Sequence, residues 1–474
     1  MTVMLPFPVV RAKPDNGLKP SRYNILYEDA GDSWLFNTRR GGYLRFPATA
    51  ADQLRFLAEP GEVWIRPEPS AAIPDDLPAS VLEQLTAGEF LIPADADELE
   101  MLKLANRAAR FGTDGLSLTI LPTLGCNLDC GYCYEDKRHG MMRPQVQEQI
   151  VEFVRRQSPI LTTFGVTWFG GEPLLGMAII DRLSTAFLEI CEQHKIGYGA
   201  DIITNGVLLT EPVARRLANL HVGAAQVTVD GPREVHNARR PKVRGGESFD
   251  VIVDNITATC ELINISVRVN LDRGNAGRAE ELIDDLAARG LAGRVTLSFA
   301  PLHADGKGCR DRGEVGSPQL FSLKEISELQ IRLNRYAHER GFPFQALPLS
   351  RAHACCADKV QSFVVEPDGT LQKCWQTVSD PQQTIGDVFS GPRMGPNLLK
   401  WMSYDPFTPG FKCTSCKILP ACMGWCPEKI MRDPSPESCN YIKHTVVEDL
   451  KLYYRTHQQT SSQPIPDASG CLRS

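Results

Sequence analysis

Three cysteines lie close together in one short segment of the chain, at Cys126, Cys130 and Cys133. Their spacing is C-x3-C-x2-C, and the segment follows an apolar stretch that ends at Leu121. Three thiolates can hold three irons of a cubane iron–sulfur cluster and leave the fourth iron without a protein ligand. In catalytic metal sites an open position is where a reactant binds. The triplet is therefore a candidate catalytic centre.

Two simpler interpretations compete with a cluster. The thiols could be buried in a core, or they could form a zinc site that a nearby residue such as His139 completes. The Gly-rich surroundings directly after a predicted strand, and the aromatic Tyr132 before Cys133, favour the cluster.

This segment resembles the signature of the radical S-adenosylmethionine (SAM) enzymes, which carry an aromatic residue before the last cysteine. The resemblance implies that the open iron binds the amino and carboxylate groups of SAM. It also implies that an electron from the cluster cleaves the sulfonium and yields a 5'-deoxyadenosyl radical. The protein would then contribute placement of the reactants and exclusion of water.

The overall composition narrows the class of protein. The 474 residues carry a net charge of -6 and show no basic region, which argues against a nucleic-acid partner. The first residues lack a basic start and a cleavage site, and no stretch is long and apolar enough for a membrane span. We therefore expect a cytoplasmic protein. In that reducing compartment, fifteen cysteines indicate metal binding rather than disulfides.

The N-terminal region, residues 1–105, reads as a small unit of strands followed by helices. Short strands are expected over 23–27, 34–37 and 41–46, and helical periodicity over 48–57 and 79–87. The unit resembles the winged-helix-like domain that precedes many radical maturases of ribosomal peptides. There a leader peptide adds a strand to an exposed sheet edge. The alternative is a structural cap on the domain that follows.

The next region alternates strands with amphipathic helices, which predicts parallel pairing with right-handed crossovers. The fold class is therefore α/β, with a partial (β/α)6 TIM barrel over 112–310. The expected strands are 116–121, 166–169, 200–203, 225–229, 266–270 and 295–299, and the expected helices are 145–156, 179–194, 211–219, 250–262 and 278–289.

Polar or Gly-rich residues follow every one of these strands. Because sites in parallel barrels lie at the C-terminal ends of the strands, we expect one common mouth there. By the family resemblance, Glu172 accepts from the ammonium group of SAM and Asn205 lies near the ribose. The predicted cofactor-binding residues are Gly170, Gly171, Glu172, Pro173, Asn205, Arg239, Arg268 and Asn270. The catalytic residue is unknown, with Asp230, His236 and His303 as candidates.

A connecting loop and helix are expected over 311–349, followed by a second cysteine region over 350–445. A β-hairpin over 363–371 would carry Cys374 back towards Cys356. Seven ordered thiols are too many for one zinc site. The spacing resembles the SPASM domain, which carries two auxiliary 4Fe-4S clusters. By that resemblance one cluster is held by Cys413, Cys416, Cys422 and Cys439, and the other by Cys356, Cys374 and Cys426.

The fourth ligand of the latter cluster stays open between Cys355, Cys309 and a vacant iron. Cys191 and Cys260 lie in helical stretches and are expected to be buried apolar residues. A C-terminal helix and a disordered tail over 446–474, which contains Cys471, complete the chain.

The first functional hypothesis is a radical SAM maturase that modifies a ribosomally synthesised peptide by crosslinking, thioether formation or epimerisation. It requires SAM, three 4Fe-4S clusters, a precursor peptide with a leader, and an electron donor such as flavodoxin or ferredoxin. The alternatives are an anaerobic sulfatase-maturase-like enzyme, a small-molecule radical dehydrogenase, and a non-catalytic iron–sulfur or zinc scaffold. Sulfatase maturases have Asp after the cysteine that matches Cys374, where this chain has Trp375.

Overall fold

The computed structural model describes residues 17–47, 51–64, 73–74, 77–135, 140–302, 320–344, 347–408 and 412–457. Four residues named above lie outside this part of the chain: His139, His303, Cys309 and Cys471. The chain forms two compact units. The first comprises residues 1–111, 345–355 and 404–474, and the second comprises 112–344 and 356–403.

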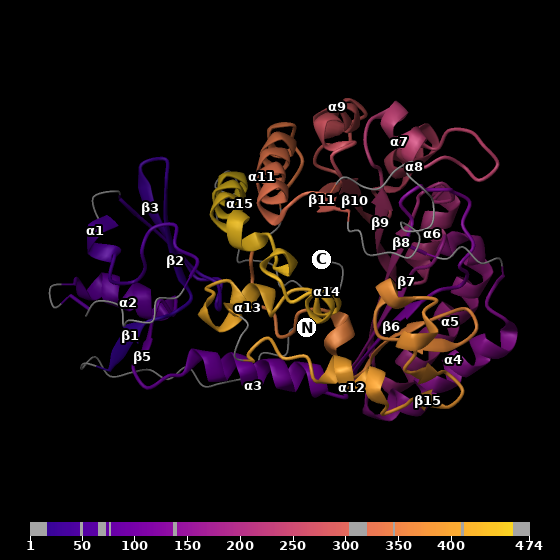
Figure 1. Ribbon diagram of the computed structural model, residues 1–474, viewed down its shortest axis with the longest axis horizontal. Helices are drawn as coiled ribbons and strands as arrows, with labels where there is room; N and C mark the ends of the chain where they lie inside the picture. The colour runs from indigo at the N-terminus through magenta and orange to yellow at the C-terminus, as the bar shows by residue number, and fades with distance from the viewer. Residues whose placement is uncertain are drawn as a thin grey trace. The chain divides into compact units, whose positions relative to one another are not determined.

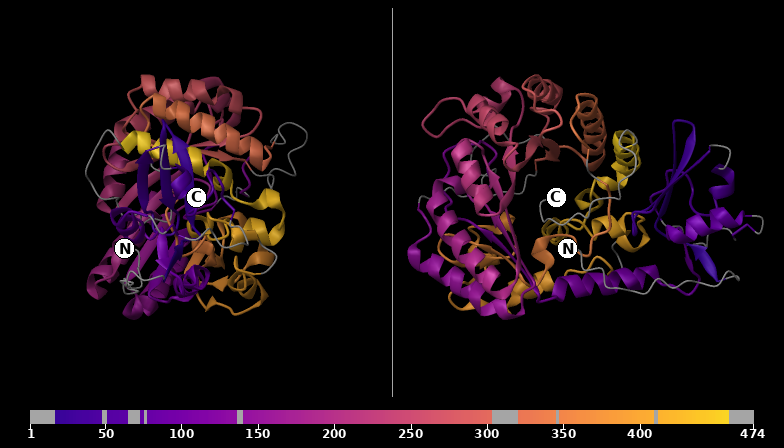
Figure 2. Two further views of the ribbon diagram at one scale, coloured as in Figure 1. Left: turned by 90° about the vertical axis from the view of Figure 1, so that its left-hand side faces the viewer. Right: turned by 180° about the vertical axis from the view of Figure 1, so that it is seen from behind.

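The second unit contains a partial (β/α)6 barrel, as the alternation of strands and helices predicted. Six parallel strands pair in the order β11-β10-β9-β8-β7-β6, and helices cover their outer face (Figures 1 and 2). The strands are β6 (Gly115–Ile120), β7 (Thr163–Trp168), β8 (Gly197–Thr204), β9 (Val222–Thr228), β10 (Asn264–Leu271) and β11 (Thr296–Pro301). The helices are α4 (Pro144–Gln157), α5 (Met177–His194), α6 (Glu211–Asn219), α7 (Arg233–Arg239), α8 (Phe249–Thr259), α9 (Ala279–Ala288) and α11 (Leu323–Glu339).

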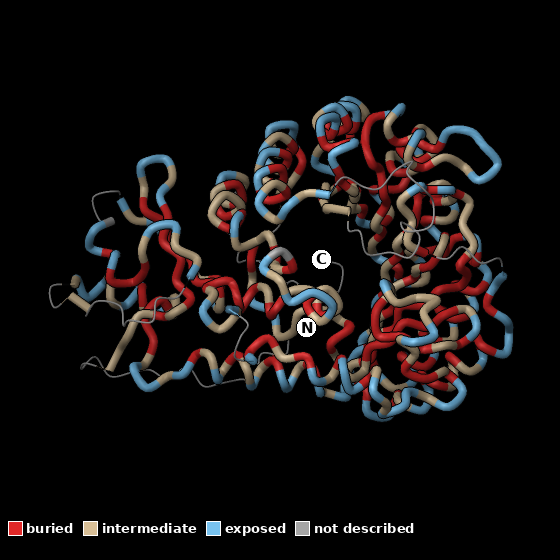
Figure 3. The backbone as a smooth tube through the Cα atoms, in the orientation of Figure 1, coloured by how far each residue is buried: buried red, intermediate tan, exposed pale blue. Residues whose placement is uncertain are grey.

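The strands bury one face and leave the other partly accessible. On β10 the apolar side chains from Ile265 to Leu271 are buried at alternate positions, while Arg268 and Asn270 between them are half-buried. Side chains alternate across a strand, so both polar residues lie on the face away from the covering helices. The same alternation puts Asp201 of β8 on that face. Figure 3 shows the buried positions concentrated along the strands and the inner sides of the helices.

The predicted hairpin is confirmed, and it extends the barrel sheet. Strand β12 (Ser362–Val365) pairs in parallel with β6, and β13 (Thr370–Gln372), β14 (Gly386–Asp387) and β15 (Gly391–Pro392) continue the sheet. The N–H of Leu121 donates to the carbonyl of Val365 at 3.0 Å, just before the cysteine segment begins. Helix α12 (Pro396–Met402) follows.

The first unit is built around an antiparallel sheet in the order β2-β3-β4, and its strands were predicted. Elements β1 (Leu18–Pro20) and β5 (Leu91–Pro93) form a second small sheet. The other elements are β2 (Asn24–Asp29), β3 (Asp32–Asn37), β4 (Tyr43–Pro47), α1 (Ala51–Leu54), α2 (Ala79–Ala87), α3 (Glu98–Phe111), α13 (Leu419–Cys422), α14 (Pro427–Arg432) and α15 (Ile442–His457).

Two helices of this unit differ from the prediction. Helix α1 is shorter than the predicted 48–57, since the chain turns after Leu54 towards Pro60, and 48–50 lie outside the described residues. Helix α3 was not predicted. Its start carries a recognisable signal, because the carboxylate of Asp97 accepts the N–H groups of Leu99 and Glu100 at 3.1 Å each.

The C-terminal helix packs on the N-terminal sheet within the same unit. The ring of Tyr454 in α15 stacks on Tyr43 of β4 with centroids 3.4 Å apart, and on Trp34 of β3 at 5.8 Å. Arg455 pairs with Asp29 at 2.6 Å. The compact units therefore group the chain differently from the predicted domains: residues 404–457 belong with the N-terminal sheet, and Cys356 and Cys374 belong with the barrel.

No helix in the described part of the chain has the length and apolar character that a membrane span requires.

Candidate active site

The cysteine loop, residues 122–135, leaves the end of β6 and is fixed by main-chain bonds to the last residue of α7 and the segment after it. The N–H of Asp129 donates to the carbonyl of Pro241 at 2.7 Å, and the N–H of Gly131 to that of Arg239 at 3.3 Å. Cys130 is buried, whereas Cys126 and Cys133 are half-buried. The loop therefore holds its three thiols in a defined conformation.

The Gly-Gly-Glu-Pro turn after β7, residues 170–173, lies directly against this loop. The N–H of Gly171 donates to the carbonyl of Thr123 at 3.2 Å, and the N–H of Glu172 to that of Gly125 at 2.9 Å. A Cβ atom on Gly171 would overlap the main chain of the cysteine loop, and Gly170 has φ +124° as well as a similar overlap. Glycine is required here because two backbones approach closely. The structure thus brings together the two motifs singled out in the sequence.

The carboxylate of Glu172 is fully buried and has three hydrogen-bond donors. It accepts from the N–H of Leu174 at 2.9 Å, from the hydroxyl of Thr204 at 2.8 Å and from the N–H of Asn205 at 2.8 Å. Burial raises the pKa of Glu172, and these hydrogen bonds act in the opposite direction. Pro173 begins the short 3-10 turn Pro173–Gly176 that Glu172 caps. Glu172 therefore positions the end of β8 relative to the turn, in addition to any contact with a cofactor.

Asn205, at the end of β8, reaches the cysteine loop with its side chain. Its amide Nδ2 donates to Oδ1 of Asn127 at 2.6 Å and lies 3.7 Å from Sγ of Cys126. Hydrogen bonds to ligating sulfurs tune the potential of an iron–sulfur cluster. This position suits a residue that orients the loop and contacts a ligand bound to it.

Asp230 is fully buried in a polar network around Tyr132 of the cysteine loop. The hydroxyl of Tyr132 donates to Asp230 and accepts from Arg240, and Asn270 Nδ2 donates to the same hydroxyl at 3.4 Å. The other carboxylate oxygen of Asp230 accepts the N–H of Asn270 at 3.0 Å. Burial raises the pKa of Tyr132 well above its usual range. This arrangement favours a positioning role for Asp230 over that of a free base.

His236 is also fully buried, and both of its ring nitrogens have partners. Nδ1 accepts the N–H of Asp230 at 3.2 Å, and Nε2 lies 3.1 Å from the hydroxyl of Ser248. That hydroxyl donates to the carbonyl of Arg240 at 2.7 Å, so it accepts from Nε2. Burial, followed by the charges of Arg240 and Arg239, lowers the pKa of His236 to about 3. A neutral, bonded imidazole supports the loop and has no free nitrogen for a substrate.

Two adjacent arginines place unused donors beside the loop. The guanidinium of Arg239 lies 5.2 Å from the ring centroid of Tyr132, and that of Arg240 lies 6.0 Å from it. Among the described residues, Nε and Nη2 of Arg239 and Nε of Arg240 are buried without an acceptor. Buried donors of this kind fit an anionic group such as the carboxylate of SAM. Arg240 was not singled out in the sequence, where nothing distinguishes it from its neighbour.

The remaining predicted cofactor residues, Arg268 and Asn270, contact each other on β10. Nε of Arg268 donates to Oδ1 of Asn270 at 2.8 Å. Through Asn270 this pair joins the Tyr132 and Asp230 network, so hydrogen bonds connect the ends of β9 and β10 with the cysteine loop.

Cys356 and Cys374 lie at either end of the hairpin that extends the barrel sheet. Between them, the buried ammonium of Lys373 donates to the carbonyl of Ser362 at 2.7 Å and to that of Lys359. The N–H of Lys359 in turn donates to the carbonyl of Cys356 at 3.1 Å. Lys373 thus connects the segments that carry the two thiols. The ring of Trp375 packs at a tilt of 41° against Phe169, the residue before the Gly-Gly-Glu-Pro turn, with centroids 5.6 Å apart.

Four cysteines of the first unit act on one another electrostatically, and we call them the thiol quartet: Cys413, Cys416, Cys422 and Cys439. Burial, and then the charges of Cys422 and Cys439, raise the pKa of Cys413 to about 12. Burial and the charges of neighbouring quartet thiols likewise raise the pKa values of Cys416 and Cys422 to about 12. Thiols at this pKa are protonated at neutral pH, so assembly of a cluster must release protons.

The other cysteines divide as follows. Cys426 lies in the same unit as the quartet, so the three cysteines predicted for the other auxiliary cluster are divided between the two units. Cys191 and Cys260 are buried, as predicted.

No three His, Cys, Asp or Glu side chains in the described ranges converge as they would around a single metal ion. Thiolates of a cubane each bind a different iron and therefore need not converge in that way.

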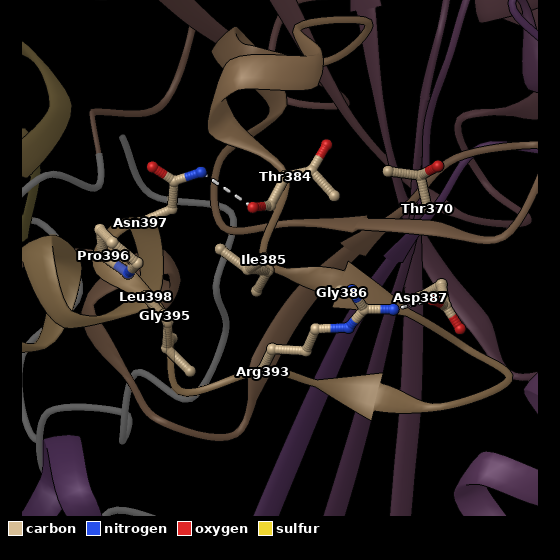
Figure 4. Close-up of a pocket in the computed structure, with 10 residues that line it drawn as sticks. All are labelled: Thr370, Thr384, Ile385, Gly386, Asp387, Arg393, Gly395, Pro396, Asn397 and Leu398. Carbon is tan, nitrogen blue, oxygen red and sulfur yellow. Dashed lines mark hydrogen bonds and ion pairs between the residues drawn. The ribbon is translucent and has the colours of Figure 1, made fainter.

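A separate cavity of about 300 Å³ lies beside β14 and α12 (Figure 4). It is lined by Thr370, Ile385 and Asn397, and by an ion pair between Arg393 and Asp387 at 3.4 Å. None of the predicted site residues lines it.

The central region of the chain matches a known protein family. Residues 120–298 match the Radical SAM superfamily. A cysteine-type anaerobic sulfatase-maturating enzyme of Clostridium novyi (strain NT) is 31% identical over 344 residues, which cover 66% of this chain and 87% of that protein. The enzyme of the same description from Clostridium perfringens (strain 13 / Type A) is 31% identical over 150 residues. That match covers 29% of this chain and only 39% of the length of the relative.

A solved structure, native anSMEcpe with bound AdoMet and Cp18Cys peptide, has the same fold. It is 20% identical with a TM-score of 0.54, and the match covers 73% of this chain and 97% of that one.

Proposed function

The chain belongs to the radical SAM superfamily, and from this premise we propose that it is a maturase that modifies a ribosomally synthesised peptide. The observation that carries the proposal is the contact between the cysteine loop and the Gly-Gly-Glu-Pro turn at the end of the parallel strands. When bound there, SAM and a 4Fe-4S cluster would supply a 5'-deoxyadenosyl radical that abstracts hydrogen from the substrate.

The residues of the chain would hold and orient these groups. Cys126, Cys130 and Cys133 would ligate the cluster, and the unused donors of Arg239 and Arg240 would bind the carboxylate of SAM. Asn205 would orient the ribose end while it keeps its bond to the loop. Tyr132, fixed by Asp230, would keep the loop from shifting when the ligand binds. The thiol quartet would hold one auxiliary cluster, and Cys356 and Cys374, which lie in the barrel unit, would contribute ligands to the other.

A peptide substrate is supported by the edge of the N-terminal sheet. Among the described residues strand β4 pairs only with β3, which makes it an edge strand of that sheet. Addition of a strand to such an edge binds a peptide through main-chain hydrogen bonds. The solved structure of the same fold has a peptide bound as well.

The test uses the full chain, reconstituted anaerobically, with SAM, dithionite and the precursor peptide encoded beside its gene. We expect about twelve irons per chain, formation of 5'-deoxyadenosine and a change in the peptide's mass or stereochemistry. Zinc in place of iron, or a reduced enzyme that forms no 5'-deoxyadenosine, would contradict the proposal. Hydrogen–deuterium exchange tests the leader-binding role separately: the main-chain amides of β4, from Tyr43 to Phe46, should become protected when the peptide is added.

Sulfatase-maturase activity is the second candidate, because of the similarity to the Clostridium novyi relative. Against it stands Trp375, since an indole packed on Phe169 cannot accept a substrate proton as a carboxylate does. Oxidation of a Ser or Cys side chain in a sulfatase-derived peptide, with the encoded precursor unchanged, would favour this candidate.

A further inference from the structure

The thiol quartet lies next to an exposed tryptophan. The side chain of Trp64 is 39% exposed, although it is large and apolar. Its main chain forms an antiparallel bridge with Cys416, and the N–H of Lys417 donates to the carbonyl of Val63 at 2.9 Å. The indole is therefore held at the surface beside a residue of the quartet.

The same place carries positive charge. The ammonium of Lys443 lies 5.7 Å from the centroid of the Trp64 ring, and its charge acts on the thiols of Cys413 and Cys416. Lys412, directly before Cys413, is exposed. Nearby, Arg22 donates to the carbonyl of Thr414 at 2.6 Å.

Against these three cations stand Glu62, two residues before Trp64, and Glu437, two residues before Cys439. Cys413 and Cys416 themselves are only half-buried. Cys413 and Cys416 are thus partly exposed, next to side chains that carry positive charge and an aromatic ring. We call Trp64, Lys412 and Lys443 the carrier surface.

We propose that the carrier surface docks a small acidic one-electron carrier protein, which exchanges an electron with a cluster held by the quartet. This rests on the proposed function, since it needs the quartet to hold an auxiliary cluster. Such encounters are brief and bury little area, so an exposed ring and a few lysines suffice. Opposite charges raise the association rate and orient the partner. In the exchange, the reduced carrier loses one electron and the oxidised cluster gains it, with no bond made or broken.

The experiment measures how fast the oxidised holoenzyme is reduced. In a stopped-flow instrument it is mixed either with the hydroquinone of a purified flavodoxin, which is acidic, or with dithionite, which needs no docking surface. Bleaching of the cluster absorbance is recorded at low and at high salt. At low salt, Lys443→Glu and Trp64→Ser should each slow reduction by flavodoxin about tenfold. Reduction by dithionite should be unchanged, and high salt should bring the flavodoxin rates of Lys443→Glu and the unmodified enzyme together.

Lys324→Glu is the matched control. It makes the same charge change on a side chain that is 83% exposed on α11, in the other unit, and it should leave both rates unchanged. Trp64→Phe keeps an aromatic ring and should retain most of the flavodoxin rate. Each variant must contain as much iron as the unmodified enzyme. If Trp64→Ser contains less iron, its rate is not used. The inference then depends on the rates of Lys443→Glu, expected to be slow, and Trp64→Phe, expected to be nearly unchanged.

Equal flavodoxin rates for Lys443→Glu and the unmodified enzyme at low salt would overturn the inference. So would a loss of precursor-peptide binding in Lys443→Glu with its flavodoxin rate intact, since the surface would then belong to the peptide. Either result is compatible with 5'-deoxyadenosine formation under dithionite, which tests the proposed function alone. If the chain holds no clusters, both proposals fail together.

Discussion

The carboxylate of Glu172 accepts a hydrogen bond from the main-chain N–H of Asn205 at 2.8 Å, and this bond joins the turn after β7 to the end of β8. The second oxygen of the same carboxylate accepts from Leu174 and Thr204. Two strand ends that carry cofactor-binding candidates are thereby fixed relative to each other by one buried side chain. The three donors offset part of the cost of burying this carboxyl group, and the charge of Arg240 acts in the same direction.

Glu172→Gln should weaken this connection. The amide has nearly the same shape, but its NH2 group must face one of the donors that the carboxylate accepts. We expect the free energy of unfolding of the apoprotein to fall by about 1–3 kcal/mol, measured by urea denaturation. Glu152→Gln changes an exposed carboxylate on α4 and should stay within about 0.5 kcal/mol of the unmodified protein. Equal stability of Glu172→Gln and Glu152→Gln would mean that the Glu172 carboxylate does not hold the two strand ends together.

Gly171→Ala should prevent the turn from packing on the cysteine loop. The added methyl would overlap the main-chain oxygens of Leu124 and Gly125, which cannot move without displacing Cys126. We expect a loss of about 1–3 kcal/mol in unfolding free energy, together with reduced iron incorporation. Gly165→Ala is the control, since a Cβ at that position of β7 meets nothing within 4 Å. If both variants incorporated iron equally, the close approach would not be needed for the cluster.

The parts of this site that could be predicted are those that leave a local pattern. The cysteine spacing, the glycines of 170–173 and the alternation of strands and helices each follow from short-range chemistry. The partners of Asp230 could not be predicted, because Tyr132 and Asn270 come from other strand ends and only the folded sheet brings them together. Likewise, nothing in the sequence near Trp64 indicates that its main chain pairs with Cys416, which lies far along the chain.

The domain organisation also depends on long-range contacts that the sequence does not reveal. The second cysteine region reads as one continuous domain in sequence, because its thiols follow one another at short spacings. In the structure β12 joins the barrel sheet beside β6, while the segment after Tyr404 packs with the N-terminal sheet. These pairings depend on long-range hydrogen bonds such as that from Thr38 to the carbonyl of Lys417, which composition does not reveal.

Tyr132 and Asp230 should behave as one unit in a double-mutant cycle. Tyr132→Phe removes the hydroxyl that donates to Asp230, and Asp230→Asn removes the charge that accepts it. Each change alone should lower the unfolding free energy of the apoprotein by about 1–3 kcal/mol. The double variant should lose less than the sum, with a coupling of about 0.5–3 kcal/mol. Additive losses would mean that the two residues act separately, and Asp230 would again be a candidate base.

His236 should contribute to acid lability of the fold and should not act as a base near neutral pH. Its pKa is lowered from 6.5 to about 3 in the folded chain, so only the unfolded chain binds its proton between these values. The stabilisation is therefore fully present above pH 6.5 and is lost as the pH falls towards 3. Between pH 7 and pH 4 this loss amounts to about 3 kcal/mol.

Urea denaturation of the apoprotein over that pH range measures this loss, with His236→Gln as the comparison. The glutamine does not titrate and can still donate to Ser248, so its stability should fall with acid by about 3 kcal/mol less than that of the unmodified chain. If the curves for His236→Gln and the unmodified chain ran parallel, His236 would be protonated in the fold. Its hydrogen bonds from Asp230 and to Ser248 would then need another explanation.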